Sequence, residues 1–307
     1  MTDPAAMPAA TDGQTDSGAS AQRGGGSLWA DAWHDLIRNP VFVVSSLVVL
    51  VVVSWAAFPG LWTDTQPTGA GCDLKSARQA PGNGHVFGTT VLGCDMYTHI
   101  IYGARPSIVI AVVVTLATAI IGGLMGITAG YFGGWLDTLI SRVTDIFLGL
   151  PFILGALIFL ALLQRQNKTT VSVVLIVLGW TTMARIVRGT VISLRNQDFV
   201  EAARAMGASN GWIIRRHILP NALAPIIVLS TLYIGTYVSA EATLTFIGVG
   251  LQYPEISWGT TIAMGQDYAI GGQFYLLLYP CIALILTVLS FIMLGDALRD
   301  ALDPKGR

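Results

Sequence analysis

Six apolar segments dominate this sequence, and each is long enough to cross the roughly 30 Å hydrocarbon layer of a bilayer. The chain has 307 residues, of which 53% are hydrophobic and only 11% are charged, whereas soluble domains carry about 25% charged residues. Because backbone groups in hydrocarbon must bond within their own segment, each run is expected to be a helix. The sequence therefore predicts an all-α, polytopic integral membrane protein with six transmembrane helices, near residues 41–58, 106–130, 146–163, 169–188, 221–250 and 274–296.

The third segment differs from the others because Pro151 interrupts it and Asp145 lies at its edge. Prolines are tolerated inside membrane helices, since neighbouring groups can satisfy the carbonyls that they free. We therefore expect a single helix that continues through Pro151.

The chain before the first span has two parts. Residues 1–27 are rich in Ala, Gly, Ser, Thr and Asp, which predicts a disordered tail without the layout of a signal peptide. Residues 28–39 place Trp29, Trp33, Leu36 and Ile37 on one helical face, which predicts an amphipathic interfacial helix. Residues 40–307 would then form one transmembrane domain, with an outer loop at 59–105 and a cytoplasmic loop at 189–220.

The distribution of Lys and Arg indicates the orientation, because cytoplasmic loops carry an excess of both. With the N-terminus inside, twelve of the seventeen cationic residues lie on the inner side and five on the outer side. The connection between the fourth and fifth segments contributes most: Arg185, Arg188, Arg195, Arg204, Arg215 and Arg216. Both termini and this connection are therefore expected to be cytoplasmic.

Residues 198–220, which we call the knuckle, combine helix-start and helix-stop signals within that connection. Asp198 with Glu201 three residues later predicts a capping box, and Gly207 is expected to end the helix in the left-handed conformation. Ser209 should cap a second short helix that closes at Pro220. Helical spacing puts Phe199, Ala202, Ala203 and Met206 on one face, and Glu201 and Arg204 on the other. By itself, such a helix could also lie on the membrane surface.

Two further patterns lie within the spans. Gly122, Gly126 and Gly130 recur every four residues, which allows another helix to approach closely. Ser230, Tyr233, Tyr237 and Glu241 share one stripe of the fifth segment, and this stripe could line a polar path. Twenty residues at about 1.5 Å each place Glu241 roughly 30 Å from the inner face, at the outer boundary. A simple interfacial or paired Glu241 is the alternative.

Motifs for catalysis and metal binding are absent from the sequence. None of Lys75, Lys168 and Lys305 stands in a phosphate-binding G-x-x-x-x-G-K-[ST] context, so any ATP must be bound elsewhere. The four histidines show no spacing typical of metal ligands, and no hydrolase motif occurs. These absences argue against an enzyme and against a metal site.

The knuckle resembles the EAA loop of ABC importer permeases, in Glu201-Ala202-Ala203, in Gly207 and in Ile218-Leu219-Pro220. Other motifs are similar, in the same order, to C-type permease subunits of dipeptide/oligopeptide ABC importers. They are 85–90 with 92–93, 102–105, 129–134, 240–252, 257–259 and 295–304, together with Asp145 and Pro151. Two departures lie on the outer side. Gly93-Cys94-Asp95 replaces the usual Gly-Arg-Asp, and Met264-Gly265-Gln266-Asp267 stands where a basic residue is usual.

This resemblance implies a permease of the type I ABC importer fold in the cell (inner) membrane. It implies a heterodimer with a second, related permease chain, two cytoplasmic ATPase domains that bind ATP and Mg²⁺, and an extracytoplasmic binding protein that delivers short peptides. The chain itself would hold no cofactor and bind no nucleic acid. The ATPase-coupling residues would be Phe199, Glu201, Ala202, Ala203, Arg204, Met206 and Gly207. Alternating access would move the solute.

Some alternatives stay open at this point. The solute could instead be a nickel complex or glutathione, and a secondary transporter or a channel is the rival class of protein. Cys72 and Cys94 lie in the same outer loop, whereas Cys281 lies in the sixth span. Because that loop faces an oxidising compartment and Cys94 stands at the family's Arg position, we expect a Cys72–Cys94 disulfide. Two free thiols are the alternative.

Overall fold

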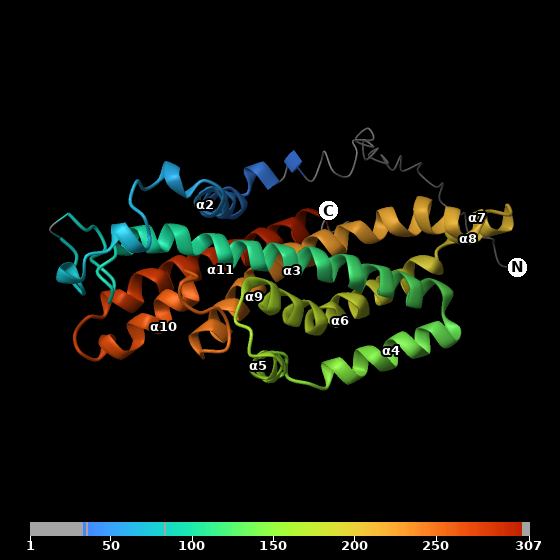
Figure 1. The fold of residues 1–307 in the computed structure, drawn as a ribbon. Coiled ribbons are helices and arrows are strands. Elements are labelled where there is room, and N and C mark those ends of the chain that lie inside the picture. Colours follow the sequence, from blue (N-terminus) through green and yellow to red (C-terminus); the bar gives the residue numbers. More distant parts are fainter. Residues whose placement is uncertain (1–32, 35, 83, 303–307) are drawn as a thin grey trace, which may run out of the picture.

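The computed structural model describes residues 33–34, 36–82 and 84–302, and within them all regular structure is helical. The predicted tail 1–27 and half of the predicted interfacial helix 28–39 lie outside these residues. The helices form one elongated bundle (Figure 1).

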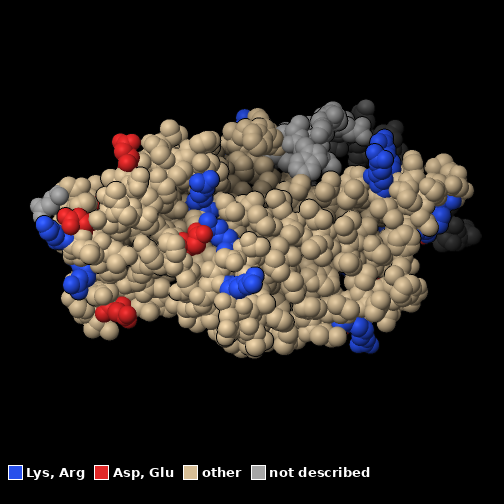
Figure 2. Space-filling view, viewed as in Figure 1, with Lys and Arg blue, Asp and Glu red and all other residues tan. Residues whose placement is uncertain are grey.

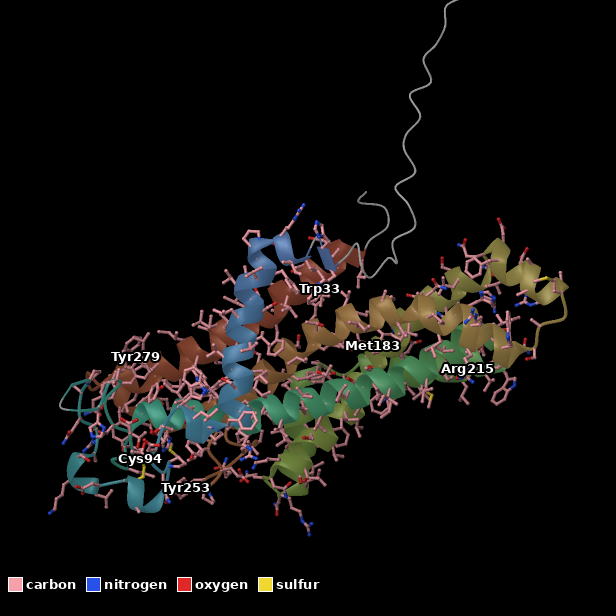
Figure 3. The ribbon with its side chains drawn as sticks, turned by 90° about the horizontal axis from the view of Figure 1, so that it is seen from above. Trp33, Cys94, Met183, Arg215, Tyr253 and Tyr279 are labelled. Carbon is pink, nitrogen blue, oxygen red and sulfur yellow. A yellow bond between two sulfur atoms is a disulfide. The ribbon has the colours of Figure 1, made fainter. Side chains whose placement is uncertain are left out.

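Five of the described helices are long and apolar enough to cross a membrane. They are α2 (Pro40–Ala57), α3 (Met96–Phe132), α6 (Lys168–Arg195), α9 (Leu219–Phe246) and α11 (Tyr275–Leu302). They include five of the six predicted spans. In Figures 1 and 3, α3, α6, α9 and α11 run along the bundle, and α2 crosses them steeply.

The expectation of a single helix that continues through Pro151 was wrong. The chain instead forms α4 (Gly134–Leu148) and α5 (Phe152–Leu163), two helices that are bent by 81° relative to one another. Pro151 is the N-cap of α5. A proline ring lacks an N–H donor and collides with the preceding turn of a helix. The nearby Gly149 also has a low helix propensity, so the helix is interrupted here. Together the pair can still make a sixth span.

The interface between α3 and α6 is built on the glycine stripe, and here the predicted close approach is confirmed. A Cβ atom added at Gly122, Gly126 or Gly130 would lie 2.6–2.8 Å from the carbonyl oxygens of Trp180, Ala184 and Arg188, respectively. Only glycine lets the two backbones come so close, and van der Waals contact along this seam stabilises the bundle.

The end of the bundle that is expected to face outward, which we call the outer end, contains a helix that the sequence did not predict. α10 (Trp258–Ala269) begins with a capping box of Ser257 and Thr260, and Trp258 is fully buried. The Trp258 indole nitrogen donates a hydrogen bond of 2.9 Å to the carbonyl oxygen of Ile100 in α3. α10 is too short to cross a bilayer, which is why a search for long apolar runs misses it.

The outside of the bundle is largely apolar. α2 buries only Ser45, Val52 and Ala56, while Leu47 and Leu50 are more than 60% exposed. Figure 2 shows few charged residues on the face that it presents. An exterior of this kind suits lipid and neighbouring transmembrane helices, so the chain is a multi-pass membrane protein.

Candidate functional site

The knuckle lies at the end of the bundle opposite to α10 and residues 59–95 (Figure 1). Its first helix, α7 (Asp198–Ala205), buries Val200 and Ala203 against Ile213 and Ile218. The predicted apolar face is therefore divided, because Ala203 is buried whereas Phe199 is 41% and Met206 is 81% exposed. The smaller side chains fit the tight seam, which leaves the larger ones in solvent.

The predicted capping box is also wrong. Gln197, rather than Asp198, is the N-cap of α7, and its side chain makes no capping hydrogen bond. The amides of Val200 and Glu201 bond instead to the carbonyl oxygen of Gln197. Asp198 and Glu201 remain in the first turn of α7, where carboxylates interact favourably with the positive end of the helix dipole.

Gly207 ends α7 as predicted, with φ at +83°. The amide of Ala208 donates to the carbonyl oxygen of Ala203 at 3.1 Å, and the amide of Gly207 donates to that of Arg204 at 3.0 Å. A Cβ at Gly207 would meet nothing within 4 Å. The constraint on this position is therefore the backbone conformation, which a β-branched residue resists, rather than space.

The second helix of the knuckle begins as predicted but does not end at Pro220. The Ser209 hydroxyl caps α8 (Asn210–Ile213) by accepting from the Trp212 amide at 3.4 Å. One π-helical turn (Ile214–Ile218) then leads directly into α9. Pro220 lies in the first turn of α9, where the helix tolerates its missing N–H. The knuckle is thus continuous with the long helix that carries the predicted stripe.

Polar and aromatic contacts hold the knuckle on the bundle. The Tyr131 hydroxyl of α3 donates to the side-chain oxygen of Asn210 at 3.0 Å. His217 lies between Phe199 and Trp212, with ring centroids 5.6 and 5.1 Å away. In contrast, Ala202 and the charged Glu201 and Arg204 are exposed, and no ion pair of theirs occurs among the described residues.

The stripe predicted on α9 is split by the structure. Tyr233 and Tyr237 line a cavity of about 230 Å³ between α9, α6 and the bent α4–α5 pair. Ser230 is half-buried and does not line this cavity. Tyr237 is only 3% exposed, and a Cβ at Gly179 would lie 2.2 Å from its hydroxyl oxygen. The absence of a side chain at Gly179 therefore makes room for Tyr237.

Glu241 lies away from that cavity, inside the packed outer end of the bundle. Its side chain is fully buried, rather than at an open boundary, and accepts hydrogen bonds from the Ser107 hydroxyl at 2.7 Å and the Thr245 hydroxyl at 2.9 Å. α3 and α10 cover the position, which helical spacing along α9 alone could not reveal. The arrangement matches the alternative of a paired Glu241.

Two ion pairs between α4 and α6 were missed by the sequence analysis. Arg188 binds Asp137, and Arg185 binds Asp145 at 2.8 Å. Arg188, Asp145 and Arg185 line a second cavity of about 400 Å³. Arg185 and Arg188 share one face of α6 because they are three residues apart, and this spacing was the available signal.

The outer segment between α2 and α3 contains three short 3-10 helices and the two loop cysteines. The sulfur atoms of Cys72 and Cys94 lie 2.08 Å apart, at bonding distance, and Cys281 is separate in α11. Figure 3 shows Cys94 at the end of the molecule opposite to Arg215 of the knuckle. No potential metal site of three or more His, Cys, Asp or Glu occurs in the described part of the chain.

Comparison with known families gives two matches. The model described as "Binding-protein-dependent transport system inner membrane component" matches residues 122–307, more than half of the chain. The model described as "N-terminal TM domain of oligopeptide transport permease C" matches residues 27–81.

Curated relatives are similar over nearly the whole chain. The dipeptide transport system permease protein DppC of Alkalihalophilus pseudofirmus is 39% identical, over 91% of this chain and 90% of the relative. The oligopeptide transport system permease protein OppC of Bacillus subtilis is 34% identical, over 92% and 91%. The glutathione transport system permease protein GsiD of Escherichia coli O6:K15:H31 is 35% identical, over 90% of each.

A solved structure of the MetNI methionine ABC transporter in an inward-facing conformation has the same fold. It is 22% identical with a TM-score of 0.57, and covers 68% of this chain and 98% of that one. The family match, the relatives and this fold agree with the all-α permease architecture expected from the sequence. The chain belongs to the family of binding-protein-dependent transport system inner membrane components.

Proposed function

We propose that this chain is a permease subunit of an ATP-driven importer that carries short peptides across the cell membrane. The observation that carries the proposal is the similarity to dipeptide and oligopeptide permeases, which extends over about nine-tenths of the chain. The match to the N-terminal domain of oligopeptide permease C supports the same class.

The knuckle is the part of the chain to which the ATPase domains would transmit their movement. Its exposed Phe199, Ala202 and Met206 form a shallow apolar surface, flanked by Glu201 and Arg204. Such a surface fits a groove on a soluble ATPase better than a lipid layer, because charged side chains border it. Movement of α7 would pass through the Gly207 turn and α8 into α9, since α8 and α9 are continuous.

The remaining partners follow from the same proposal. A second, related permease chain would complete the path and cover apolar surface such as that of α2. Two ATPase domains would bind ATP and Mg²⁺, while this chain would hold no cofactor. With the knuckle and both termini in the cytoplasm, the Cys72–Cys94 segment and α10 would face the compartment of the binding protein.

Glutathione is the second candidate solute, because permeases named for glutathione transport are 32–35% identical to this chain. It is favoured less, since the dipeptide permeases are more similar. The wider family match sets aside a secondary transporter or a channel, both of which would work without an ATPase.

Reconstitution of the co-purified complex in proteoliposomes tests the proposal. Radiolabelled dipeptide should accumulate only when the binding protein is outside and ATP is inside. Glutathione in the same assay separates the two solutes. Omission of ATP and of the binding protein are the controls. Uptake by this chain alone, or uptake driven by an ion gradient without ATP, would contradict the proposal.

A further inference from the structure

The two ion pairs between α4 and α6 differ in the number of hydrogen bonds that join their side chains. Arg188 donates from both Nε and Nη2 to the two carboxylate oxygens of Asp137, and Ser141 adds a longer contact of 3.4 Å. The Arg188 side chain is 34% exposed and the Asp137 side chain is 23% exposed. Such a two-pronged pair is stronger and more fixed in geometry than a pair joined by one bond. Asp137–Arg188 is therefore a clamp that holds α4 on α6.

The Asp145–Arg185 pair is open by comparison. One hydrogen bond of 2.8 Å joins Nη2 of Arg185 to Oδ1 of Asp145, and it is the only side-chain bond of either residue among the described residues. The side chains are 55% and 54% exposed. A guanidinium has five N–H donors and a carboxylate has several acceptor sites. Most of this capacity is therefore available to a ligand.

The open pair borders a built cavity. It lines the polar cavity of about 400 Å³, together with Ser141 and Thr144 on α4. The aromatic cavity of Tyr233 and Tyr237 begins about one helical turn further outward, roughly 5 Å away, at Phe147 on α4 and Thr182 on α6. α4 and α6 thus carry a charged cavity followed by an aromatic cavity along the same wall.

Asp145 and Arg185 both line the polar cavity, so a solute that enters it meets both charges. A half-exposed cation beside a half-exposed anion is complementary to a solute that carries one charge of each sign. An extended dipeptide with free termini has a carboxylate and an ammonium group within roughly 7 Å of one another.

We propose that Asp145 and Arg185 form a solute-binding site for the charged termini of a short peptide, with Arg185 receiving the carboxylate and Asp145 the ammonium group. The inference rests on the proposed function. The site selects peptides by the charges of their termini and makes no contact that depends on the peptide's side chains. Asp137–Arg188, three residues along α6, keeps the wall in place while the open pair exchanges partners.

A protection assay tests the site without involving the selectivity of the binding protein. The complete permease–ATPase complex is prepared without nucleotide, with Cys281→Ser as background and Ser141→Cys as a reporter in the polar cavity. The probes are the dipeptide Ala-Phe, its N-acetylated form, its C-terminal amide, and free phenylalanine. The rate at which a charged maleimide labels residue 141 is measured against the concentration of each probe.

Ala-Phe should protect the reporter, and either blocked form should need about a tenfold higher concentration, as expected for loss of one charge-assisted contact. Asp145→Asn should abolish the difference between Ala-Phe and its N-acetylated form. Arg185→Gln should abolish the difference between Ala-Phe and its amide. Asp137→Asn is the matched control, and should keep the ranking of all four probes even if the complex is less stable.

Three results would overturn the site. One is equal protection by free and blocked peptides in the parent complex. Another is no protection by Ala-Phe in a complex that imports Ala-Phe with ATP, which leaves the proposed function intact. The last is protection by free phenylalanine equal to that by Ala-Phe, which would assign the site to amino acids. Failure of ATP-driven peptide uptake by the parent complex would instead count against the proposed function.

Discussion

The two ends of the bundle hold their side chains in opposite ways. At the outer end, Glu241 is buried under two hydroxyl donors and Trp258 bonds to the backbone of α3. At the knuckle, Phe199 and Met206 stand in solvent, and one glycine sets the direction of α7.

The difference fits the proposed function, in which the knuckle contacts an ATPase and the outer end is packed within this chain. Buried polar groups that satisfy one another make a packed region rigid, and loss of one member leaves the others without partners. Exposed residues contribute little to folding, so they are available for contact with another chain. Substitutions at the outer end should therefore affect stability, and substitutions at the knuckle should affect coupling.

The largest effect is expected for Glu241→Ala. The change leaves the Ser107 and Thr245 hydroxyls unpaired and opens a cavity, which should lower the free energy of unfolding by about 4 kcal/mol. Thermal unfolding of the detergent-solubilised protein measures it. Glu241→Gln keeps most of the volume and an acceptor oxygen, so it should retain much of the stability. A stable Glu241→Ala protein would mean that the outer end is less tightly packed than its hydrogen bonds indicate.

The next effect concerns the segment closed by Cys72 and Cys94, which are 22 residues apart. Cys72→Ser should destabilise the outer segment by about 3 kcal/mol in the chain-entropy model. Limited proteolysis of residues 59–95 measures this loss, and Cys281→Ser, which removes the free thiol in α11, is the control. Mass spectrometry after alkylation without reductant tests the bond itself. Label on both loop cysteines would show that they are unpaired.

A smaller effect on stability, but a severe one on transport, is expected for Gly207→Val. The left-handed backbone of this turn costs a β-branched residue about 1–2 kcal/mol, so α7 should be misdirected. Membrane insertion should persist while ATP-driven uptake is lost. Gly211→Val in α8 is the matched control, because a Cβ there also meets nothing and the backbone φ is not positive. Normal uptake by the Gly207→Val complex would remove the coupling role of the knuckle.

The smallest effect on stability is expected for Glu201→Ala. Because Glu201 is exposed and forms no capping box, its loss should change the free energy of unfolding by less than about 0.5 kcal/mol. Uptake should still fall, since the carboxylate lies on the proposed contact surface. The ratio of ATP hydrolysed to peptide imported measures this loss. A drop in melting temperature as large as that of Gly207→Val would show that Glu201 acts within the fold.

The sequence by itself determined those features that depend on residues near one another in the chain. The length of the apolar runs predicted α2, α3, α6, α9 and α11, because hydrocarbon thickness sets a minimum length. The spacing of Gly122, Gly126 and Gly130 predicted a close helix contact, and Gly207 predicted the end of α7. In each case, the preference of the backbone follows from residues that are close together in the sequence.

Only the tertiary structure decided which neighbour each side chain meets. Helical periodicity put Tyr237 and Glu241 on one stripe, but packing sends the first toward a cavity and the second toward Ser107. Proline is compatible with either a kinked continuous span or a break, and the structure shows the break at Pro151. The Asp145–Arg185 pair joins residues forty positions apart. Such contacts depend on how separate helices pack, and periodicity within one helix carries no information about its partners.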